Sequence, residues 1–218
     1  MKTSVILPAY NEGKNIGSVI KSIKHTGRYE IIVVDDGSTD NTLGVARSYD
    51  CNCVRLSKNK GKGFACVTGA KIASFENLVF IDSDGQLDAR EIPKMLSALN
   101  RCDLAVGVRN ISGIPPQRRL SNSFAKKVLS AAAGKNLGDV LCGFRAIRKD
   151  DFLELKLKKK RYEIEAEMII KAVKNNLRIK EVPVKVWYGI GSSMPVKDSI
   201  KVASYIVLQG IKKNIISL

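Results

Sequence analysis

Short apolar runs alternate with amphipathic stretches along the first half of the chain. The apolar runs have few polar residues, as is typical of strands buried on both faces of a parallel sheet, and they lie at 4–7, 30–34, 53–56, 78–81 and 104–108. The stretches between them have apolar residues at helical spacing, at 15–24, 40–49, 63–74 and 92–99. This repeated order of strand and helix predicts an α/β fold, with a doubly wound, mostly parallel sheet and helices on both faces.

The pattern changes after Val108. Two prolines at 115–116 indicate a loop, and the later elements are less regular. We expect helices over 121–133 and 163–175, a strand over 143–147, a strand or hairpin over 177–188, and an amphipathic helix over 198–216. A chain of 218 residues with 44% hydrophobic content can form one large domain. We therefore predict a single domain with two halves, 1–110 and 111–196, and a C-terminal helix over 197–218.

The charge of the chain indicates an anionic partner. Lys and Arg number 37 against 21 Asp and Glu, which gives a net charge of +16. Nucleic acid, an acidic membrane surface and phosphorylated small molecules all fit this charge. Nucleic acid is disfavoured, because only 6% of residues are aromatic and no stacking or zinc-finger motif is present.

Cysteine and histidine usage excludes several kinds of chemistry. Five cysteines without a Cys-x-x-Cys pair, and the single histidine His25, argue against disulfides and a zinc site and indicate a reducing compartment. A lone histidine also removes Ser-His-Asp and Cys-His catalysis. The chain enters a strand at once and has no apolar segment of membrane-spanning length, so we expect neither a secretory signal nor a transmembrane helix.

Two carboxylates follow the apolar run at 78–81 directly. Asp82 and Asp84 would emerge at the carboxyl edge of the sheet, where open α/β folds bind their ligands. Their hard oxygen atoms suit Mg²⁺ or Mn²⁺, and the amide oxygen of Gln86 is a candidate third ligand. The alternative is an Asp-rich turn that caps the helix starting near Asp88.

A second acidic pair, Asp35-Asp36, follows the apolar run at 30–34. Both clusters would lie at the same sheet edge and face one ligand. Neither has the spacing of an EF-hand, and the glycine motifs of P-loop enzymes and dinucleotide dehydrogenases are absent. The remaining interpretation is a nucleotide whose base lies by the first two turns and whose diphosphate a metal binds at the third.

Several motifs in order resemble those of family-two inverting glycosyltransferases, which have the GT-A fold. They are Val5-Ile6-Leu7-Pro8-Ala9-Tyr10-Asn11-Glu12, Val33-Val34-Asp35-Asp36-Gly37-Ser38-Thr39-Asp40, Asn59-Lys60-Gly61-Lys62-Gly63 and Asp82-Ser83-Asp84-Gly85-Gln86. Further segments are similar to the narrower branch of dolichyl-phosphate mannose and glucose synthases, namely Asp139, Cys142-Gly143-Phe144-Arg145-Ala146 and Tyr162-Glu163-Ile164-Glu165. The match covers about residues 1–188.

The resemblance implies roles in binding the nucleotide sugar. The residues implied to line the base and ribose pocket are Pro8, Tyr10, Glu12 and Asp36. The alternative is that these four residues only form turns and one ion pair. Lys62 either contacts the nucleotide or only closes its loop. Asp82, Asp84 and Gln86 would hold the metal on the donor diphosphate, where its Lewis acidity neutralises the leaving group.

The resemblance also implies a polyprenyl phosphate acceptor. Its phosphate oxygen is already ionised at neutral pH, so no strong general base is needed. The candidates to bind it are arginines, because guanidinium binds phosphate with two hydrogen bonds; they are Arg118, Arg119 and Arg145. A solvated basic patch is the alternative for the first two. Asp139 and Glu165 either orient hydroxyl groups or cap helices and carry surface charge, and a hydroxyl acceptor would make Asp139 the leading base. The expected catalytic residues are Asp84, Asp139 and Arg118.

One segment departs from the family pattern. Relatives carry Arg-x-Gly-x-Ser-Lys after the late strand and so supply cations to the diphosphate, whereas 188–194 reads Tyr-Gly-Ile-Gly-Ser-Ser-Met. Lys197 is the candidate replacement. The basic helices expected at 124–129 and 197–213 either lie on an anionic membrane surface or pack on the sheet.

These observations predict a metal-dependent, inverting hexosyltransferase. It would move a sugar from a donor of the GDP-mannose or UDP-glucose type to polyprenyl (dolichyl) phosphate, as a peripheral protein on the cytoplasmic face of the membrane. The first alternative is a family-two transferase with a soluble or glycan hydroxyl acceptor. The second, from another class, is a non-catalytic basic module that binds nucleic acid in a salt-sensitive manner.

Overall fold

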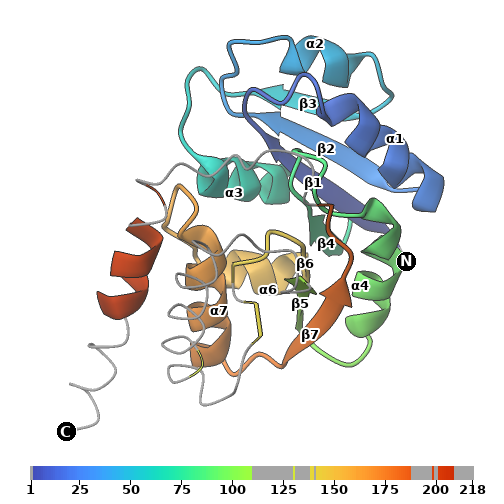
Figure 1. Cartoon of the computed structure of the whole chain (residues 1–218). Helices are drawn as coiled ribbons and strands as arrows, with labels where there is room; N and C mark the ends of the chain where they lie inside the picture. The colour runs from blue at the N-terminus through green and yellow to red at the C-terminus, as the bar shows by residue number, and fades with distance from the viewer. Residues whose placement is uncertain are drawn as a thin grey trace, which may run out of the picture.

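A computed structural model describes residues 2–109, 130, 138–139, 141–187, 198 and 201–208. Within these residues one sheet has the strand order β3-β2-β1-β4-β6-β5-β7 (Figure 1). The strands are β1 (Thr3–Ala9), β2 (Glu30–Asp35), β3 (Asn52–Arg55), β4 (Asn77–Phe80), β5 (Leu104–Arg109), β6 (Arg145–Arg148) and β7 (Ile179–Val184). The helices are α1 (Ile16–Thr26), α2 (Thr42–Arg47), α3 (Lys62–Ile72), the 3₁₀ turn η1 (Ala89–Glu91), α4 (Ile92–Ala98), α6 (Lys149–Glu154) and α7 (Ile164–Lys174).

The central strands are buried on both faces, as their continuous apolar sequence predicts. Val5 and Leu7 of β1 belong to the core layer under α1 and α4, and Ile6 between them belongs to the layer under α3, α6 and α7. All three side chains are fully buried. Each contributes about 1.5–3 kcal/mol by leaving water. Figure 1 shows these two helical layers on opposite sides of the sheet.

The predicted alternation of strand and helix holds through β5, and then the pattern changes. β1 pairs in parallel with β2 and with β4. β6 comes from the second half of the chain, lies between β4 and β5, and is antiparallel to both. β7 pairs in parallel with β5 at the sheet edge, where Pro183 needs no ladder donor. The sheet is therefore mostly parallel with one antiparallel insertion, and both halves of the chain build it.

The described part of the C-terminal helix packs on the protein. Val202 and Ile206 are buried against Ala166, Ile169 and Ile170 of α7. The apolar residues of this helix are therefore buried in the protein, against α7 rather than directly on the sheet. The helix expected at 121–133 lies outside the described residues, except for Ser130, which is helical. Among the described helices, none combines the length and apolar character needed to cross a bilayer.

Candidate active site

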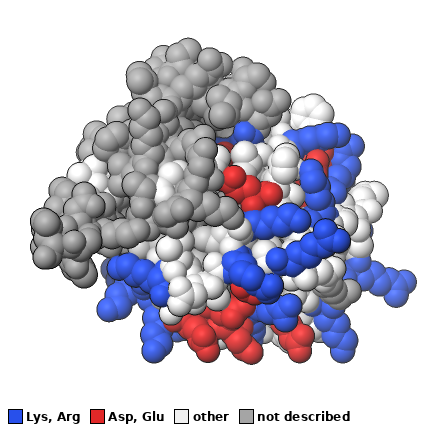
Figure 2. Space-filling model, turned by 90° about the horizontal axis from the view of Figure 1, so that it is seen from below, with Lys and Arg blue, Asp and Glu red and all other residues white. Residues whose placement is uncertain are grey.

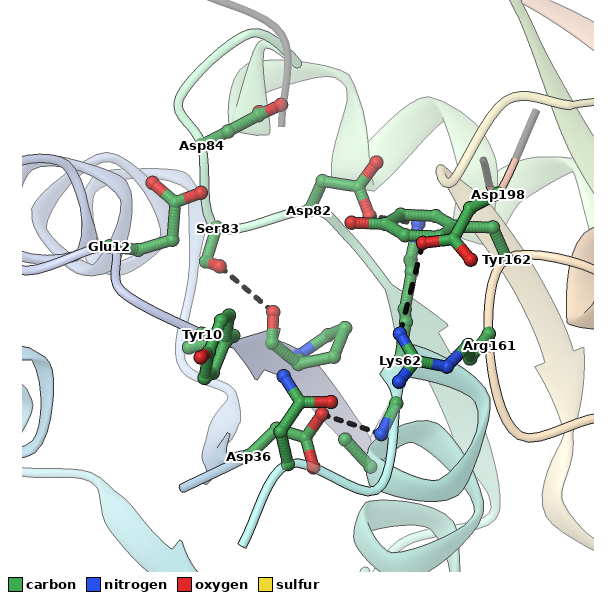
Figure 3. Close-up of a pocket in the computed structure, with 15 residues that line it drawn as sticks. Tyr10, Glu12, Asp36, Lys62, Asp82, Ser83, Asp84, Arg161, Tyr162 and Asp198 are labelled. Atoms are coloured by element: carbon green, nitrogen blue, oxygen red, sulfur yellow. Dashed lines mark hydrogen bonds and ion pairs between the residues drawn. The ribbon is translucent and has the colours of Figure 1, made fainter. Parts of the chain in front are cut away.

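A cavity opens at the carboxyl edge of the parallel strands (Figure 3). Tyr10 follows β1, Asp36 follows β2, and Asp82 and Asp84 follow β4, and all four line this cavity. Its empty space is about 820 Å³, including the solvent space at its mouth. Asp36 of the first acidic pair and both carboxylates of the second thus line one cavity, whereas Asp35 is fully buried.

Most of the predicted donor-binding residues line this cavity. They are Pro8, Tyr10, Glu12, Asp36, Lys62, Asp82 and Asp84. Gln86 is not among the lining residues; its backbone N–H donates to Asp84 Oδ1 at 2.9 Å and its carbonyl accepts from Trp187 N–H at 2.8 Å. The backbone of Gln86 therefore helps to fix the turn that carries Asp84. The proposed role of its amide oxygen as a metal ligand stays a prediction.

The sequence analysis did not select four of the polar residues that line the cavity. They are Asn59, Arg161, Tyr162 and Asp198; Ser83, a fifth, is turned to the Pro8 carbonyl, to which its hydroxyl donates at 2.8 Å. Asn59 and Tyr162 stand in the family-like motifs, so their position in those motifs is a signal that could have found them. Arg161 and Asp198 carry no such signal, because the packing of the segment before α7 and of the C-terminal helix brings them to the site.

Burial and the charge of Asp82 raise the pKa of two carboxyl groups at the cavity. Asp84 is 8% exposed, and its burial, followed by the charge of Asp82, raises the pKa of Asp84 to about 6. Burial also raises the pKa of Glu12, against a hydrogen bond from Asn15, and Asp82 adds to the increase. A cation bound between these carboxylates would stabilise their charged forms, because burial and mutual repulsion disfavour them.

The oxygen ligands at the cavity fit Mg²⁺ or Mn²⁺. Asp82 and Asp84 both face the cavity, and Mg²⁺ in proteins commonly takes one or two carboxylates and completes its shell with water and substrate phosphate. No group of three or more His, Cys, Asp or Glu side chains in the described part of the chain is arranged to hold a metal alone. Two carboxylates at the mouth of a cavity match a divalent metal that completes its shell with water and phosphate.

The raised pKa of Asp84 predicts a pH dependence of folding in the presence of EDTA. The unfolded carboxyl has an ordinary pKa of 3.8 and the folded one titrates at about 6, so unfolding releases a proton between these values. Stability from this group is therefore complete below pH 3.8 and is lost as pH rises to about 6. Asp84→Asn should remove that loss and stabilise the protein at pH 7 by about 1–3 kcal/mol. Urea unfolding of both proteins from pH 4.5 to 7.5 measures this, and equal stability at pH 7 would contradict it.

Lys62 joins two carboxylates from distant parts of the chain. It begins α3, and its Nζ lies 2.5 Å from Asp82 Oδ1 and 2.6 Å from Glu165 Oε1 of α7. Burial by itself lowers the pKa of Lys62, but Asp82 and Glu165 outweigh it and hold that pKa well above its usual value. Lys62 therefore stays charged and fixes the Asp82 carboxylate at the edge of the cavity.

The turn before α3 depends on close backbone packing. Gly61 has φ +98°, and a Cβ there would stand 2.7 Å from Arg161 Cγ and closer still to Lys160 O. Phe64 N–H donates to the same Lys160 oxygen at 3.0 Å.

The Asp36 carboxylate accepts from the N–H groups of Lys60 and Gly61, each at 2.7 Å. Burial still raises the pKa of Asp36 despite these bonds. Asp36 thus holds the turn as well as lining the cavity, so both of its expected roles remain open.

Gly143 lies directly against the Asp82 carboxylate. A Cβ at Gly143 would stand 2.5 Å from Asp82 Oδ1 and closer to Oδ2. We expect Gly143→Ala to push this carboxylate aside and to weaken Mn²⁺-dependent nucleotide binding about 10-fold or more, because displacements near 1 Å are costly in such sites. The side chain can move, so the thermal midpoint should change by only about 2–4 °C. Calorimetric titration and thermal unfolding test both parts, and unchanged affinity would contradict the expectation.

Two predicted acceptor-side residues are placed differently from the expectation. Arg145 is 1% exposed, and its guanidinium donates to the carbonyls of Cys142 at 3.1 Å and Glu165 at 2.7 Å. An acceptor phosphate cannot reach it in this arrangement, because the side chain is buried and two of its donors bind backbone carbonyls. Asp139 pairs with Arg109 through two contacts of 2.5 and 3.0 Å. Arg118, Arg119 and Lys197 lie outside the described residues.

The fold and the family of the chain are shown by comparison with known proteins. The mixed seven-stranded sheet matches that of GT-A glycosyltransferases. The model of glycosyl transferase family 2 matches residues 4–156, and the chain belongs to this family. The protein is therefore a glycosyltransferase.

Relatives in this family carry names that specify lipid phosphate acceptors. The chain is 34% identical over 198 residues to a dolichol-phosphate mannosyltransferase of Pyrococcus furiosus, over 84% of this chain and 56% of the relative. It is 30% identical to a UDP-N-acetylglucosamine–dolichyl-phosphate N-acetylglucosaminyltransferase of Methanococcus voltae, over 84% of this chain and 85% of the relative.

Solved structures of glucosyl-3-phosphoglycerate synthase from Mycobacterium tuberculosis share the fold. One complex with phosphoglyceric acid has a TM-score of 0.79 at 23% identity, covering 97% of this chain and 79% of that chain. Another, with Mn²⁺ and UDP-glucose, has a TM-score of 0.77 at 22% identity, covering 95% of this chain and 77% of that chain.

Proposed function

We propose that the protein transfers a hexose, with inversion, from a nucleoside diphosphate sugar of the GDP-mannose or UDP-glucose type to polyprenyl phosphate. The observation that carries this proposal is the convergence of Asp36, Asp82 and Asp84 on one cavity at the carboxyl edge of the sheet. The names of the relatives that use dolichyl phosphate support the acceptor class.

Asp82 and Asp84 are proposed to hold Mg²⁺ or Mn²⁺ on the donor diphosphate. When bound, the metal acts as a Lewis acid that stabilises the negative charge of the departing nucleoside diphosphate. Tyr10 and Asp36 lie at the end of the cavity assigned to the base and ribose, and Asn59 Oδ1 is a buried oxygen without a hydrogen-bond partner there. A base N–H could donate to this oxygen. Positioning and electrostatics then provide most of the rate increase.

Two side chains that could act as general bases, His25 and Asp139, are not among the residues that line the cavity. His25 is exposed on α1 and its ring contacts the Lys21 carbonyl, and Asp139 is held by Arg109. Neither is placed as a free general base. A phosphate oxygen needs no such base, whereas a sugar hydroxyl does. The choice of polyprenyl phosphate over a soluble or glycan hydroxyl therefore rests mainly on the names of the relatives.

The charge of the surface fits work beside an anionic membrane. Figure 2 shows Lys and Arg side chains over much of one face, with acidic side chains gathered in clusters among them. We propose peripheral attachment at the cytoplasmic face, where anionic lipids attract basic proteins. We further propose that 1–110 binds the donor and 111–196 the acceptor, with 197–218 as the C-terminal helix.

The test is transfer of radiolabelled sugar in the presence of Mn²⁺. The chain is incubated with UDP-glucose, UDP-N-acetylglucosamine or GDP-mannose, and with dolichyl phosphate, free sugars or 3-phosphoglycerate. We expect label to enter the organic phase with one donor, only with dolichyl phosphate and only before EDTA is added. Label in a water-soluble product alone would establish the hydroxyl alternative. Tight, salt-sensitive binding to DNA or RNA without any transfer would instead support the nucleic-acid module.

A further inference from the structure

The donor cavity contains far more acid than base. Among the described residues, its lining has five carboxylates: Glu12, Asp36, Asp82, Asp84 and Asp198. The cations in the same lining are Lys62 and Arg161. Lys62 already contacts two carboxylates, Asp82 and Glu165, at 2.5 and 2.6 Å. A diphosphate that enters this cavity therefore needs a further cation besides a metal, and Arg161 is the described residue able to supply it.

Arg161 differs from Lys62 in how strongly it is held. Its guanidinium lies 3.8 Å from Asp198 Oδ2, beyond hydrogen-bond distance, and its side chain is 46% exposed. The Asp198 side chain is 6% exposed. Figure 3 shows the guanidinium reaching into the cavity toward Asp198, on the side where Asp36 lies. The charge of Arg161 also acts on Asp36, whose pKa it lowers against the larger effect of burial.

The position of Arg161 is fixed by its backbone and by the stem of its side chain. Its carbonyl accepts from Ile164 N–H at 3.2 Å at the start of α7. The stem packs on Gly61, where a Cβ would stand 2.7 Å from Arg161 Cγ. The guanidinium is thus carried by a stem in a defined place while its donors remain loosely engaged, an arrangement suited to binding an anion.

We propose that Arg161 binds the diphosphate of the donor, and that Asp198 of the C-terminal helix holds Arg161 at the cavity when no donor is present. The inference rests on the proposed function. Guanidinium binds phosphate oxygens with paired, charge-assisted hydrogen bonds, which are shorter and stronger than its contact with Asp198. The segment 188–194 contains neither Arg nor Lys, and Lys197, the other candidate for this cation, lies outside the described residues. Donor binding would then exchange one anionic partner of Arg161 for another.

The experiment compares diphosphates with nucleosides. Binding of UDP and GDP with Mn²⁺, and of uridine and guanosine by competition, is measured for wild type and Arg161→Ala. We expect Arg161→Ala to lower the affinity for the nucleoside diphosphate roughly 10- to 100-fold, the usual effect of losing a charged hydrogen bond. The affinity for the nucleoside should stay within about twofold of wild type. Arg161→Lys should recover part of the loss, because it restores the charge without the paired geometry. A merely structural role would change both ligands equally.

The matched control is Arg178→Ala. Arg178 is 67% exposed and pairs with Asp103 at 2.8 Å, so this variant removes the same charge and an ion pair away from the cavity. It should leave diphosphate affinity unchanged. Asp198→Asn should bind the diphosphate at least as tightly as wild type, since the amide no longer competes for Arg161; binding tenfold weaker would overturn the role of Asp198.

The outcomes separate this inference from the proposed function. If wild type binds neither UDP nor GDP with Mn²⁺, both fail. If wild type binds one of them and Arg161→Ala retains its affinity within about twofold, the role of Arg161 is overturned and the proposed function stands. An equal loss of nucleoside and diphosphate affinity has the same meaning, because it would show a general distortion of the cavity.

Discussion

Asp84→Ala should lower the rate of sugar transfer about 10²- to 10³-fold and abolish the Mn²⁺ dependence of nucleotide binding. Asp84 is 8% exposed and lines the same cavity as Asp82, where the metal is proposed to meet the donor diphosphate. Losing one of the two proposed carboxylate ligands weakens metal binding. The negative charge of the leaving group then loses its main source of stabilisation. Initial rates and calorimetric titration of the nucleotide, with and without Mn²⁺, measure the two effects.

The matched control for this prediction is Asp150→Ala. Asp150 is an exposed carboxylate in the first turn of α6, outside the cavity lining, and its loss should leave transfer within about twofold. The Asp84→Ala protein should also remain folded in EDTA, because the substitution removes a desolvated charge. If Asp84→Ala retained full Mn²⁺-dependent binding, the proposed metal site would be wrong, whatever its effect on the rate.

Lys62→Met should destabilise the protein by about 2–4 kcal/mol, which lowers the thermal midpoint of a chain of this size by roughly 5–15 °C. The Lys62, Asp82 and Glu165 side chains are 15%, 28% and 7% exposed, so removing the cation leaves two carboxylates facing each other with little water. Asp82 is exposed enough to recover some hydration, so the expected loss of unfolding free energy is smaller than for a fully buried ion pair. Urea unfolding at pH 7 measures the free energy.

The same variant should also weaken donor binding, since Lys62 fixes the Asp82 carboxylate. Lys94→Met is the control: Lys94 is 51% exposed, lies 3.4 Å from Glu91 and also donates to the Pro183 carbonyl, away from the cavity. Surface ion pairs of this kind contribute about 0–1 kcal/mol, so that variant should unfold close to wild type. Equal stability of Lys62→Met and Lys94→Met would show that the ion pairs of Lys62 do not stabilise the fold. Loss of stability with unchanged donor affinity would separate folding from the site.

The sequence by itself determined the first half of the fold and the place of the site. The apolar runs without polar alternation identify β1, β2 and β4 as doubly buried strands, because only a central parallel sheet excludes water from both faces. Acidic residues directly after β2 and β4 must then emerge at the same edge. Asp36, Asp82 and Asp84 were predicted to face one ligand on this ground, and the structure places them around one cavity. The family-like motifs specified the GT-A fold.

The tertiary structure alone decided what joins these elements. Periodicity gives the type of an element but not its partner, so nothing in 143–147 showed that β6 would lie antiparallel between β4 and β5. Arg145 has the residue type of a phosphate ligand, yet burial turns its guanidinium to backbone carbonyls, because desolvated donors must be satisfied. Arg161 and Asp198 reach the cavity only because Gly61 packs against the segment before α7 and the C-terminal helix packs on α7. Contacts between residues far apart in the chain depend on the packing of the whole domain, so a local sequence pattern does not predict them.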